Sequence, residues 1–257
     1  MNKQSRYIGI NQKVPIGLLE KYIMNYLETG VIDSAAIKAD ISLVYKGKNR
    51  ASKAFQYANR ILSHNKTILE FIQKRIGNER YKRLNGTDKH AITLALISLA
   101  YPLFYDVIVV LAKVFRVQEL VSRRYIAQKI GSLYGSNRTL EIALDAIFPM
   151  LVDLNLILRA KRGVYSAVPC KDLVDDKVAE LFVAIGIRLS GGKQISIDDF
   201  EYRDWHFFLK PKQPPYQNQV LLVISKTGAK QGYIEFKNPK ELDKKQLTRE
   251  MEHKNDP

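Results

Sequence analysis

Apolar side chains recur at helical spacing along most of the first 170 residues. In residues 16–29 (IGLLEKYIMNYLET) the apolar positions fall three or four apart, which predicts an amphipathic helix with Gly30 as its C-cap. Asp33 or Ser34 is expected to cap a short second helix that runs through Leu43. The pattern therefore opens with two helices and gives no sign of a strand.

The helical pattern resumes after a basic turn at residues 45–50 (YKGKNR). We expect Ser52 to open a helix whose apolar face includes Phe55, and another helix to follow from about Thr67 to Ile76. Residues 80–86 are predicted to form a polar, basic link. The first 86 residues thus form an N-terminal helical lobe.

The longest apolar stretch covers residues 91–112 (AITLALISLAYPLFYDVIVVLA). Thr87 or Asp88 is expected to cap its first helix, and Pro102 to divide or kink it. The stretch has the length of a membrane-spanning helix. However, Pro102 and Asp106 lie in its middle, and a carboxylate at mid-membrane is costly. We therefore prefer two buried helices that meet near Pro102 and no membrane contact.

Two further helices and a hairpin are predicted before residue 170. A helix over residues 121–133 precedes a turn at Gly135, and Ser136 is expected to cap the next helix. That helix carries apolar residues at positions 140, 143, 144, 147, 151 and 154, which lie on one face, and Pro149 should kink it or end it early. Residues 156–160 and 164–168 then form a hairpin around Lys161-Arg162-Gly163.

The remaining sequence predicts a small α+β region. Residues 178–189 form a helix ended by Gly191, prolines mark a loop at 211–215, and residues 220–224 pair with 233–236. The fold class is mainly α. Its expected units are a helical lobe (1–86), a helix-turn-helix and hairpin unit (87–170), an α+β region (171–238) and a charged tail expected to be disordered (239–257).

The charge of the chain is unusual and unevenly placed. Its 41 Lys and Arg exceed its 26 Asp and Glu, which gives a net charge of +15. Residues 1–170 hold 26 of these basic and 12 of these acidic side chains, and residues 46–83 hold 11 basic and two acidic ones. A basic surface of this kind favours a polyanionic partner such as nucleic acid.

The composition also restricts the compartment. The single cysteine, Cys170, excludes an internal disulfide framework and a zinc site of several cysteines. The first residues, MNKQSRYIGINQK, lack the apolar core of a signal peptide. We therefore expect a cytoplasmic protein.

The order of helix, turn, capped helix and basic hairpin is the layout of a winged helix-turn-helix. The second helix would offer its first turn to the major groove, where its free N–H groups also favour phosphate. Asn and Arg suit base edges, and Ser and Thr suit phosphate oxygens. The expected contacts of this unit are Arg123, Arg124, Ser136, Asn137, Arg138, Thr139, Arg159, Lys161 and Arg162.

An alternative is that this unit serves only packing or dimerisation. Glu141 and Asp145 lie further along the second helix and would repel phosphates, so only its first turn could approach DNA comfortably.

The basic stretch 46–83 is the second candidate surface. Its proposed phosphate contacts are Lys46, Lys48, Arg50, Lys53, Arg60, Arg80, Lys82 and Arg83. Aromatic residues interleaved with them, Tyr45, Phe55, Tyr57 and Tyr81, could stack on unpaired bases. More often such rings belong to the core, and the helical spacing of Phe55 favours the core.

The same layout is similar to BrxA-like proteins, accessory components of the bacterial BREX phage-defence system. The similarity covers roughly residues 7–170 and rests on element order, on the segments KGKNRASKAFQYANRILS and HAITLALISLAYPLFYDVIVVLAKVF, and on the Ser-x-Arg-Thr helix ending in LVDLNLI. The resemblance implies a NusB-like helical bundle joined to winged-helix elements, and a non-catalytic, DNA-binding role. The DNA-binding role that the resemblance implies is carried over to Arg138, Thr139 and the segment from Lys46 to Lys53. Residues after Cys170 match nothing in the family.

Catalytic motifs are scarce. The four histidines are scattered without metal-ligand spacing, and no complete phosphate-binding loop occurs. One enzyme hypothesis remains: Glu235 and Lys237, with Asp198, Asp199 and Asp204, could form a metal-dependent nuclease site.

The sequence as a whole favours a protein that is not an enzyme, needs no cofactor or metal, and binds duplex DNA, with other defence-system proteins as further partners. A protein-interaction scaffold and a transcriptional regulator are the alternatives. The sequence indicates neither an oligomeric state nor a choice between DNA and RNA.

Overall fold

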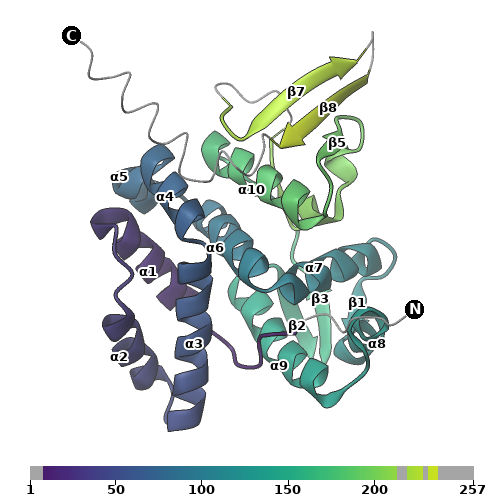
Figure 1. The fold of residues 1–257 in the computed structure, drawn as a ribbon. Coiled ribbons are helices and arrows are strands. Elements are labelled where there is room, and N and C mark those ends of the chain that lie inside the picture. Colours follow the sequence, from purple (N-terminus) through teal and green to yellow (C-terminus); the bar gives the residue numbers. More distant parts are fainter. Residues whose placement is uncertain (1–7, 213–218, 228–230, 237–257) are drawn as a thin grey trace, which may run out of the picture.

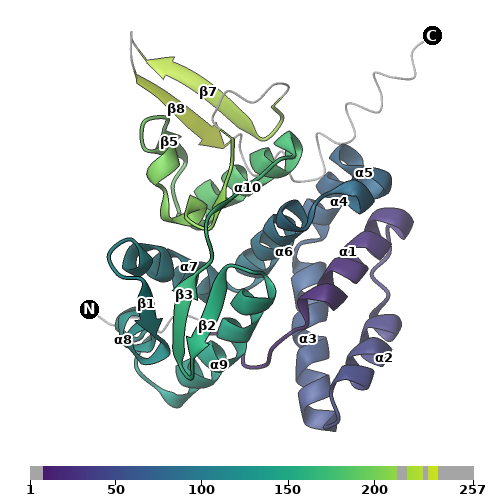
Figure 2. The ribbon, with the colours of Figure 1, turned by 180° about the vertical axis from the view of Figure 1, so that it is seen from behind.

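Helices make up most of the computed structural model, which describes residues 8–212, 219–227 and 231–236 (Figures 1 and 2). The helices in this part of the chain are α1 (Ile16–Thr29), α2 (Ser34–Val44), α3 (Lys48–His64), α4 (Lys66–Arg75), α5 (Gly77–Arg83), α6 (Gly86–Ala100), α7 (Pro102–Phe115), α8 (Arg123–Tyr134), α9 (Arg138–Asp153) and α10 (Asp176–Leu189), with short 3-10 turns η1 (Phe200–Tyr202) and η2 (Asp204–His206). The strands are β1 (Leu120–Ser122), β2 (Ile157–Lys161), β3 (Val164–Ala167), β4 (Lys171–Asp172), β5 (Gln194–Ser196), β6 (Leu209–Lys210), β7 (Leu222–Thr227) and β8 (Gln231–Phe236). The prediction of a mainly helical fold with small sheets is confirmed.

Local capping signals place the first helices where the sequence predicts them. Gly30 ends α1 with a φ of 72°, the left-handed conformation that glycine adopts without steric cost. The side chain of Asp33 accepts a hydrogen bond from the backbone N–H of Ala36 and so caps α2.

Two predictions in the N-terminal lobe are wrong. Helix α3 begins at Lys48 rather than Ser52, and residues 80–83, predicted as part of a link over 80–86, belong to α5. In α3 the early helix face is made of Ala51 and Ala54, which are buried but too small to give a strong apolar signal. In α5 one side chain, that of Tyr81, is buried, and the helix packs against α1 and α4.

Helix α6 runs through the middle of the molecule between α3 and α10 (Figures 1 and 2). Its residues are buried on all sides, as expected for a helix that is apolar around its circumference. Asn65, which is itself buried, donates hydrogen bonds from its side-chain amide to the carbonyls of Ile61 and Leu96. Because the Asn65 side chain bonds to a carbonyl of α3 and to a carbonyl of α6, the packing of these two helices is fixed by polar contacts as well as by apolar burial.

The apolar stretch around Pro102 is two helices, as predicted. Tyr101 ends α6, and Pro102 occupies the first turn of α7, where the missing N–H is no loss. Asn85, rather than Thr87 or Asp88, caps α6. Within the described residues no single helix is long and apolar enough to cross a membrane; α6 and α7 reach that length only together, bent by 119°.

Asp88 joins the central helix to the C-terminal region. Its buried carboxylate accepts hydrogen bonds from the backbone N–H groups of Val174 and Asp175, just before α10. Buried apolar side chains form one continuous cluster from Ile10 to Ile234. The predicted division at residues 86, 170 and 238 stays a prediction, and the predicted tail (239–257) lies outside the described residues.

The C-terminal region packs α10 against the loop that follows it. Trp205 stacks on Phe182 and donates its indole N–H to the Phe182 carbonyl, and a Cβ at Gly186 would overlap the Trp205 ring. The buried carboxylate of Glu180 accepts hydrogen bonds from Val220 and Leu221, which lead into β7. The predicted helix and the predicted hairpin, β7 with β8, are confirmed.

Lowering the pH is expected to destabilise the fold through His206. Burial lowers the pKa of His206 to about 4, and its Nδ1 lies 2.8 Å from the Phe200 carbonyl oxygen. The folded protein favours the neutral ring, so this contribution is complete above about pH 6.5 and is lost as the pH falls toward 4. We expect a loss of about 2–3 kcal/mol in the free energy of unfolding between pH 7.5 and 4.5. Urea unfolding at both pH values should show most of this loss disappearing in His206→Gln; equal losses in the two proteins would contradict it.

Candidate nucleic-acid interface

Helices α7, α8 and α9 and strands β1, β2 and β3 form a helix-turn-helix with a small sheet. The antiparallel strands lie in the order β1-β3-β2, so that the strand before α8 pairs with the hairpin after α9. The backbone N–H of Arg123 donates to the Gly163 carbonyl over 2.8 Å, which ties the hairpin turn to the start of α8. The hairpin prediction is confirmed, and Gly163 in its turn has a positive φ, 71°.

Strand β1 was not predicted. The sequence assigns Val121 to the start of a helix, but α8 begins only at Arg123, where the Ser122 side chain accepts from the Tyr125 N–H. Only Val121 is buried in this three-residue strand, so the alternation is too short to be recognised before its partner β3 is known.

The turn between α8 and α9 sets the start of the second helix. Gly135 has a φ of 84°, and Asn137, not Ser136, is the N-cap: its side chain accepts a hydrogen bond from the Leu140 N–H at 2.9 Å. Ser136 instead lies against α8, where a Cβ at Gly131 would overlap its hydroxyl. Pro149 does not end α9 early, because the helix continues to Asp153.

Removing this cap should cost a measurable part of the stability. We expect Asn137→Ala to lower the free energy of unfolding by about 1 kcal/mol, because the Leu140 N–H loses its partner. Ser136→Ala is the matched control, since the neighbouring hydroxyl caps nothing, and it should change stability by less than about 0.5 kcal/mol. Chemical denaturation of the two variants distinguishes them; equal effects would show that Asn137 is not the functioning cap.

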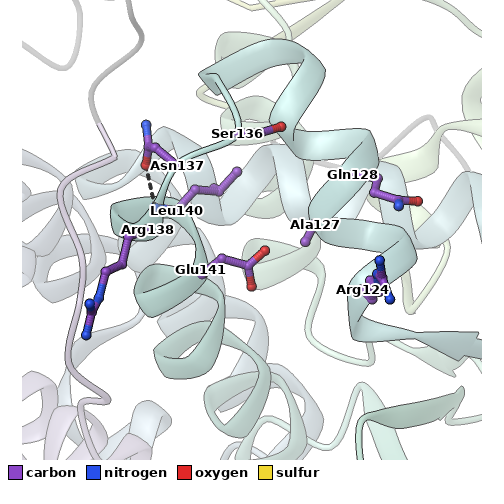
Figure 3. Close-up of a pocket in the computed structure, with 8 residues that line it drawn as sticks. All are labelled: Arg124, Ala127, Gln128, Ser136, Asn137, Arg138, Leu140 and Glu141. Carbon is purple, nitrogen blue, oxygen red and sulfur yellow. Dashed lines mark hydrogen bonds between the residues drawn. The ribbon is translucent and has the colours of Figure 1, made fainter.

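A pocket of about 360 Å³ lies between α8 and the first turn of α9. Arg124 and Gln128 line it from α8, and Asn137, Arg138 and Glu141 line it from α9. In Figure 3 the Arg138 side chain extends away from Arg124 and Gln128, so cations flank the first turn of α9 on two sides. Gln128 was missed in the sequence, although it lies one helical turn after Arg124 on the same face.

Two acidic side chains of α9, Glu141 and Asp145, are paired with an arginine from α8. Arg123 contacts the Glu141 carboxylate at 2.7 Å and the Asp145 carboxylate at 2.8 Å, and it also donates to the Glu141 carbonyl. The sequence places Arg123 among the DNA contacts, but here it offsets the two charges that would repel phosphate. Both carboxylates remain exposed at the surface.

The hairpin tip and the first turn of α9 expose their cations. Arg159, Lys161 and Arg162 are exposed on the hairpin, and the register shifts between Arg159 and Lys161. Arg138 and Thr139 are exposed on α9. Within the described chain none of these cations makes an ion pair. The positive charge at these positions is therefore available to a ligand.

The basic stretch 46–83 divides into two separate surfaces. Lys46, Lys48, Arg50 and Lys53 lie in the α2–α3 turn and the first turns of α3, and none of them is ion-paired in the part of the chain that the structure describes. This turn lies at the same, lower end of the molecule as the α8–α9 loop in Figures 1 and 2. We call these four residues the α3 basic cluster.

The cations of α5 lie elsewhere. In both views α5 lies toward the upper part of the molecule, far from the α2–α3 turn (Figures 1 and 2). Arg80 pairs with Asp175 at 2.6 Å and Lys82 with Glu79 at 2.9 Å, whereas Arg83 is exposed. Arg60, in the second half of α3, lies 5.7 Å from the centre of the Tyr101 ring.

The aromatic residues of this stretch serve packing. Tyr81 is 1% exposed, so it cannot stack on a base, and the stacking prediction is wrong for this residue. Tyr45 and Tyr57 are partly buried and donate their hydroxyls to the Lys13 carbonyl and the Asn11 side chain. Phe55 packs against the core, as its spacing indicated.

The residues of the nuclease hypothesis are only partly described. Glu235 in β8 accepts a hydrogen bond from the Ser225 hydroxyl, while Lys237 lies outside the described residues. Asp204 lies near Lys113 and Arg116. In the described ranges no group of three or more His, Cys, Asp or Glu residues could hold a metal ion.

Comparisons with protein-family models, with curated proteins and with solved structures found no match.

Proposed function

We propose that this protein is a non-catalytic, nucleic-acid-binding protein that binds duplex DNA through a winged-helix-like unit and the α3 basic cluster. The observation that carries the proposal is the arrangement α7-β1-α8-α9-β2-β3, with a β1-β3-β2 sheet and exposed cations at the first turn of α9 and at the hairpin tip. A helix presented by its first turn beside a basic hairpin suits a major groove and its flanking phosphates. The sequence resemblance supports a NusB-like N-terminal lobe and an accessory role in bacterial phage defence, with other defence proteins as partners.

In this proposal one group of residues supplies affinity for DNA and another supplies sequence preference. The α3 basic cluster holds charge but no helix face suited to base edges, so it contacts phosphates. Asn137 uses its side-chain oxygen as the cap, which leaves Arg138 as the residue of this turn best suited to a guanine edge. Arg138→Ala should therefore change sequence preference by about 1–3 kcal/mol and affect random DNA less.

Arg123 supports binding indirectly in this proposal. Arg123→Ala exposes the full charge of Glu141 and Asp145, so we expect duplex affinity to fall by about tenfold at low salt. Adding Glu141→Gln and Asp145→Asn to that variant should restore most of the affinity, because the repulsion is removed with its source. Fluorescence anisotropy on one random duplex measures all three proteins. A triple variant that binds as weakly as Arg123→Ala would instead make Arg123 a direct phosphate contact.

The proposal is tested against its alternatives by incubating the protein with duplex DNA and Mg²⁺. We expect binding without cleavage. Cleavage that needs Mg²⁺ and is lost in Glu235→Ala would overturn the non-catalytic assignment. Absence of DNA binding at low salt, with retained binding to an acidic polypeptide such as polyglutamate, would favour the interaction scaffold.

A further inference from the structure

The last turn of α2 leaves two apolar side chains in solvent. Leu43 is 86% exposed and Val44 is 53% exposed, whereas Ile37 and Ile41 on the same helix are fully buried. The helix therefore directs one apolar face into the core. At its end, Leu43 and Val44 form a second apolar group that stays largely exposed within the described chain. Single exposed apolar residues are common, so the surroundings of this pair decide its meaning.

The surroundings of Leu43 are basic. The α3 basic cluster begins two residues after Val44, and Lys46, Lys48 and Arg50 of this cluster are exposed. Tyr45, between them, is partly buried and donates its hydroxyl to the Lys13 carbonyl at 2.7 Å, which fixes the turn to the body of the protein. The exposed apolar tip of α2 is thus followed closely along the chain by cations that form no ion pair among the described residues.

The helix that carries the tip is firmly supported. The Asp40 carboxylate pairs with Lys21 of α1 at 2.5 Å and accepts a hydrogen bond from the Tyr22 hydroxyl. These contacts hold α2 against α1, and the Asp33 cap stabilises the start of α2 itself. A rigid support matters because a side chain that separates stacked bases must transmit force to the protein rather than fold away.

We propose that Leu43, with Val44 beside it, is an apolar wedge that enters between base pairs of a duplex held by the α3 basic cluster, and that the protein therefore bends the DNA it binds. This inference rests on the proposed function and adds that the bound duplex is bent. Leu is among the side chains that unstack a base step from the minor groove, and such insertion bends the duplex by about 20–90°. The flanking cations would contact the phosphates that border the minor groove at the inserted step.

The chemistry of the tip fits a duplex better than a membrane surface. An interfacial helix buries a continuous apolar face along its length. In α2 the other large apolar residues, Ile37 and Ile41, are already buried in the protein, so only one turn could insert. One or two side chains are a small area for membrane insertion, whereas a single side chain is sufficient for a base step.

Fluorescence energy transfer across a roughly 30-bp random duplex with a dye at each end tests this inference in the full-length chain. We expect the wild type to shorten the end-to-end distance on binding. Leu43→Gln should bind with an affinity within about threefold, because the cations remain, but should lose most of the distance change. Val117→Gln is the matched control: Val117 is 83% exposed just after α7, is followed by Gln118 and Glu119, and its neighbour Arg116 pairs with Asp204. It should bend DNA like the wild type.

The outcomes separate the wedge from the proposed function. Wild-type binding without a distance change, or equal bending by Leu43→Gln, would overturn the wedge and leave DNA binding intact. If Val117→Gln loses bending together with Leu43→Gln, the wedge is overturned too. No duplex binding by the wild type would remove both proposals, and if the wild type, but not Leu43→Gln, then bound vesicles containing phosphatidylserine, the tip would be a membrane contact.

Discussion

Replacing Lys48, Arg50 and Lys53 together by alanine is expected to weaken binding to every duplex by about a hundredfold near 0.1 M salt. Removing one phosphate contact reduces the slope of log affinity against log salt by about 0.9, so three such removals reduce it by about 2.7. The effect should be similar for all sequences, because phosphate contacts carry no sequence information. The three side chains are exposed or half-buried and lie on the first two turns of α3, so the fold should be unaffected.

A charge-matched control uses Lys74, Arg188 and Lys193, which are exposed at the ends of α4 and α10 and in the loop after α10. Their replacement by alanine removes the same net charge at the opposite end of the molecule and should lower the slope by less than about one. If both triple variants lose the same affinity, the effect is one of net charge. If the first triple variant binds like the wild type with an unchanged slope, the α3 basic cluster is only a solvated surface.

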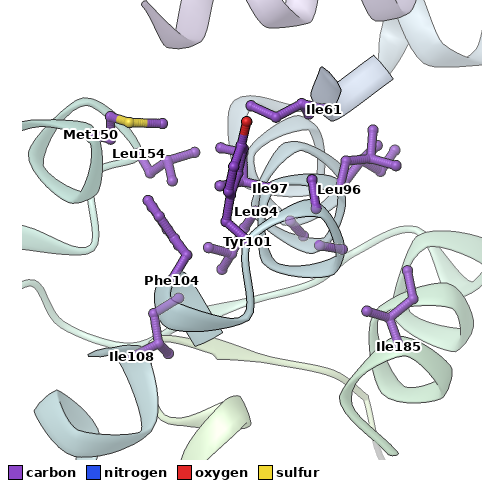
Figure 4. Close-up of a cluster of buried hydrophobic side chains, with 14 of the residues drawn as sticks. Ile61, Leu94, Leu96, Ile97, Tyr101, Phe104, Ile108, Met150, Leu154 and Ile185 are labelled. Atoms are coloured by element: carbon purple, nitrogen blue, oxygen red, sulfur yellow. The ribbon is translucent and has the colours of Figure 1, made fainter. Parts of the chain in front are cut away.

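Phe104→Ala is expected to lower the free energy of unfolding by about 4 kcal/mol. Phe104 is fully buried in α7, and Figure 4 shows it beside Ile108 and close to Leu154, with Met150 nearby. The cost combines the removal of a buried ring with the cavity that remains. For a chain of this length the midpoint of thermal unfolding should fall by roughly 8–16 °C.

The control for Phe104→Ala is Leu43→Ala, which removes an exposed side chain and should change the stability by less than about 0.5 kcal/mol. Chemical denaturation compares the two. A decrease below about 1 kcal/mol for Phe104→Ala would mean that α7 and α9 do not share a tightly packed core at this position.

Helix positions could be predicted from the sequence where spacing and local capping agree. Gly30, Asp33 and Pro102 act through bonds and torsions within a few residues, so their effects are visible in the chain itself. The start of α3 was missed because Ala51 and Ala54 give a weak pattern beside charged and polar residues. The cap of α9 was assigned one residue early because Ser and Asn both cap well, and only the backbone at Asn137 decides between them.

The candidate site was less accessible from the sequence, because its decisive contacts join distant positions. The pairing of Arg123 with Glu141 crosses 18 residues, and that of Arg80 with Asp175 crosses 95. The Arg123–Glu141 pairing makes a proposed DNA contact a partner of α9 instead. The Arg80–Asp175 pairing places part of the basic stretch on another surface. Strand β1 likewise exists only because β3 returns beside it.

The most direct test of duplex binding is a salt titration of the wild-type protein with a random duplex of about 20 bp. We expect a linear fall of log affinity with log salt between about 50 and 300 mM, with a slope of about −4 or steeper, which corresponds to at least four or five phosphate contacts. A slope near zero, or no measurable binding at about 50 mM salt, would contradict the claim that the unpaired cations of α3, α9 and the hairpin form a DNA-binding surface.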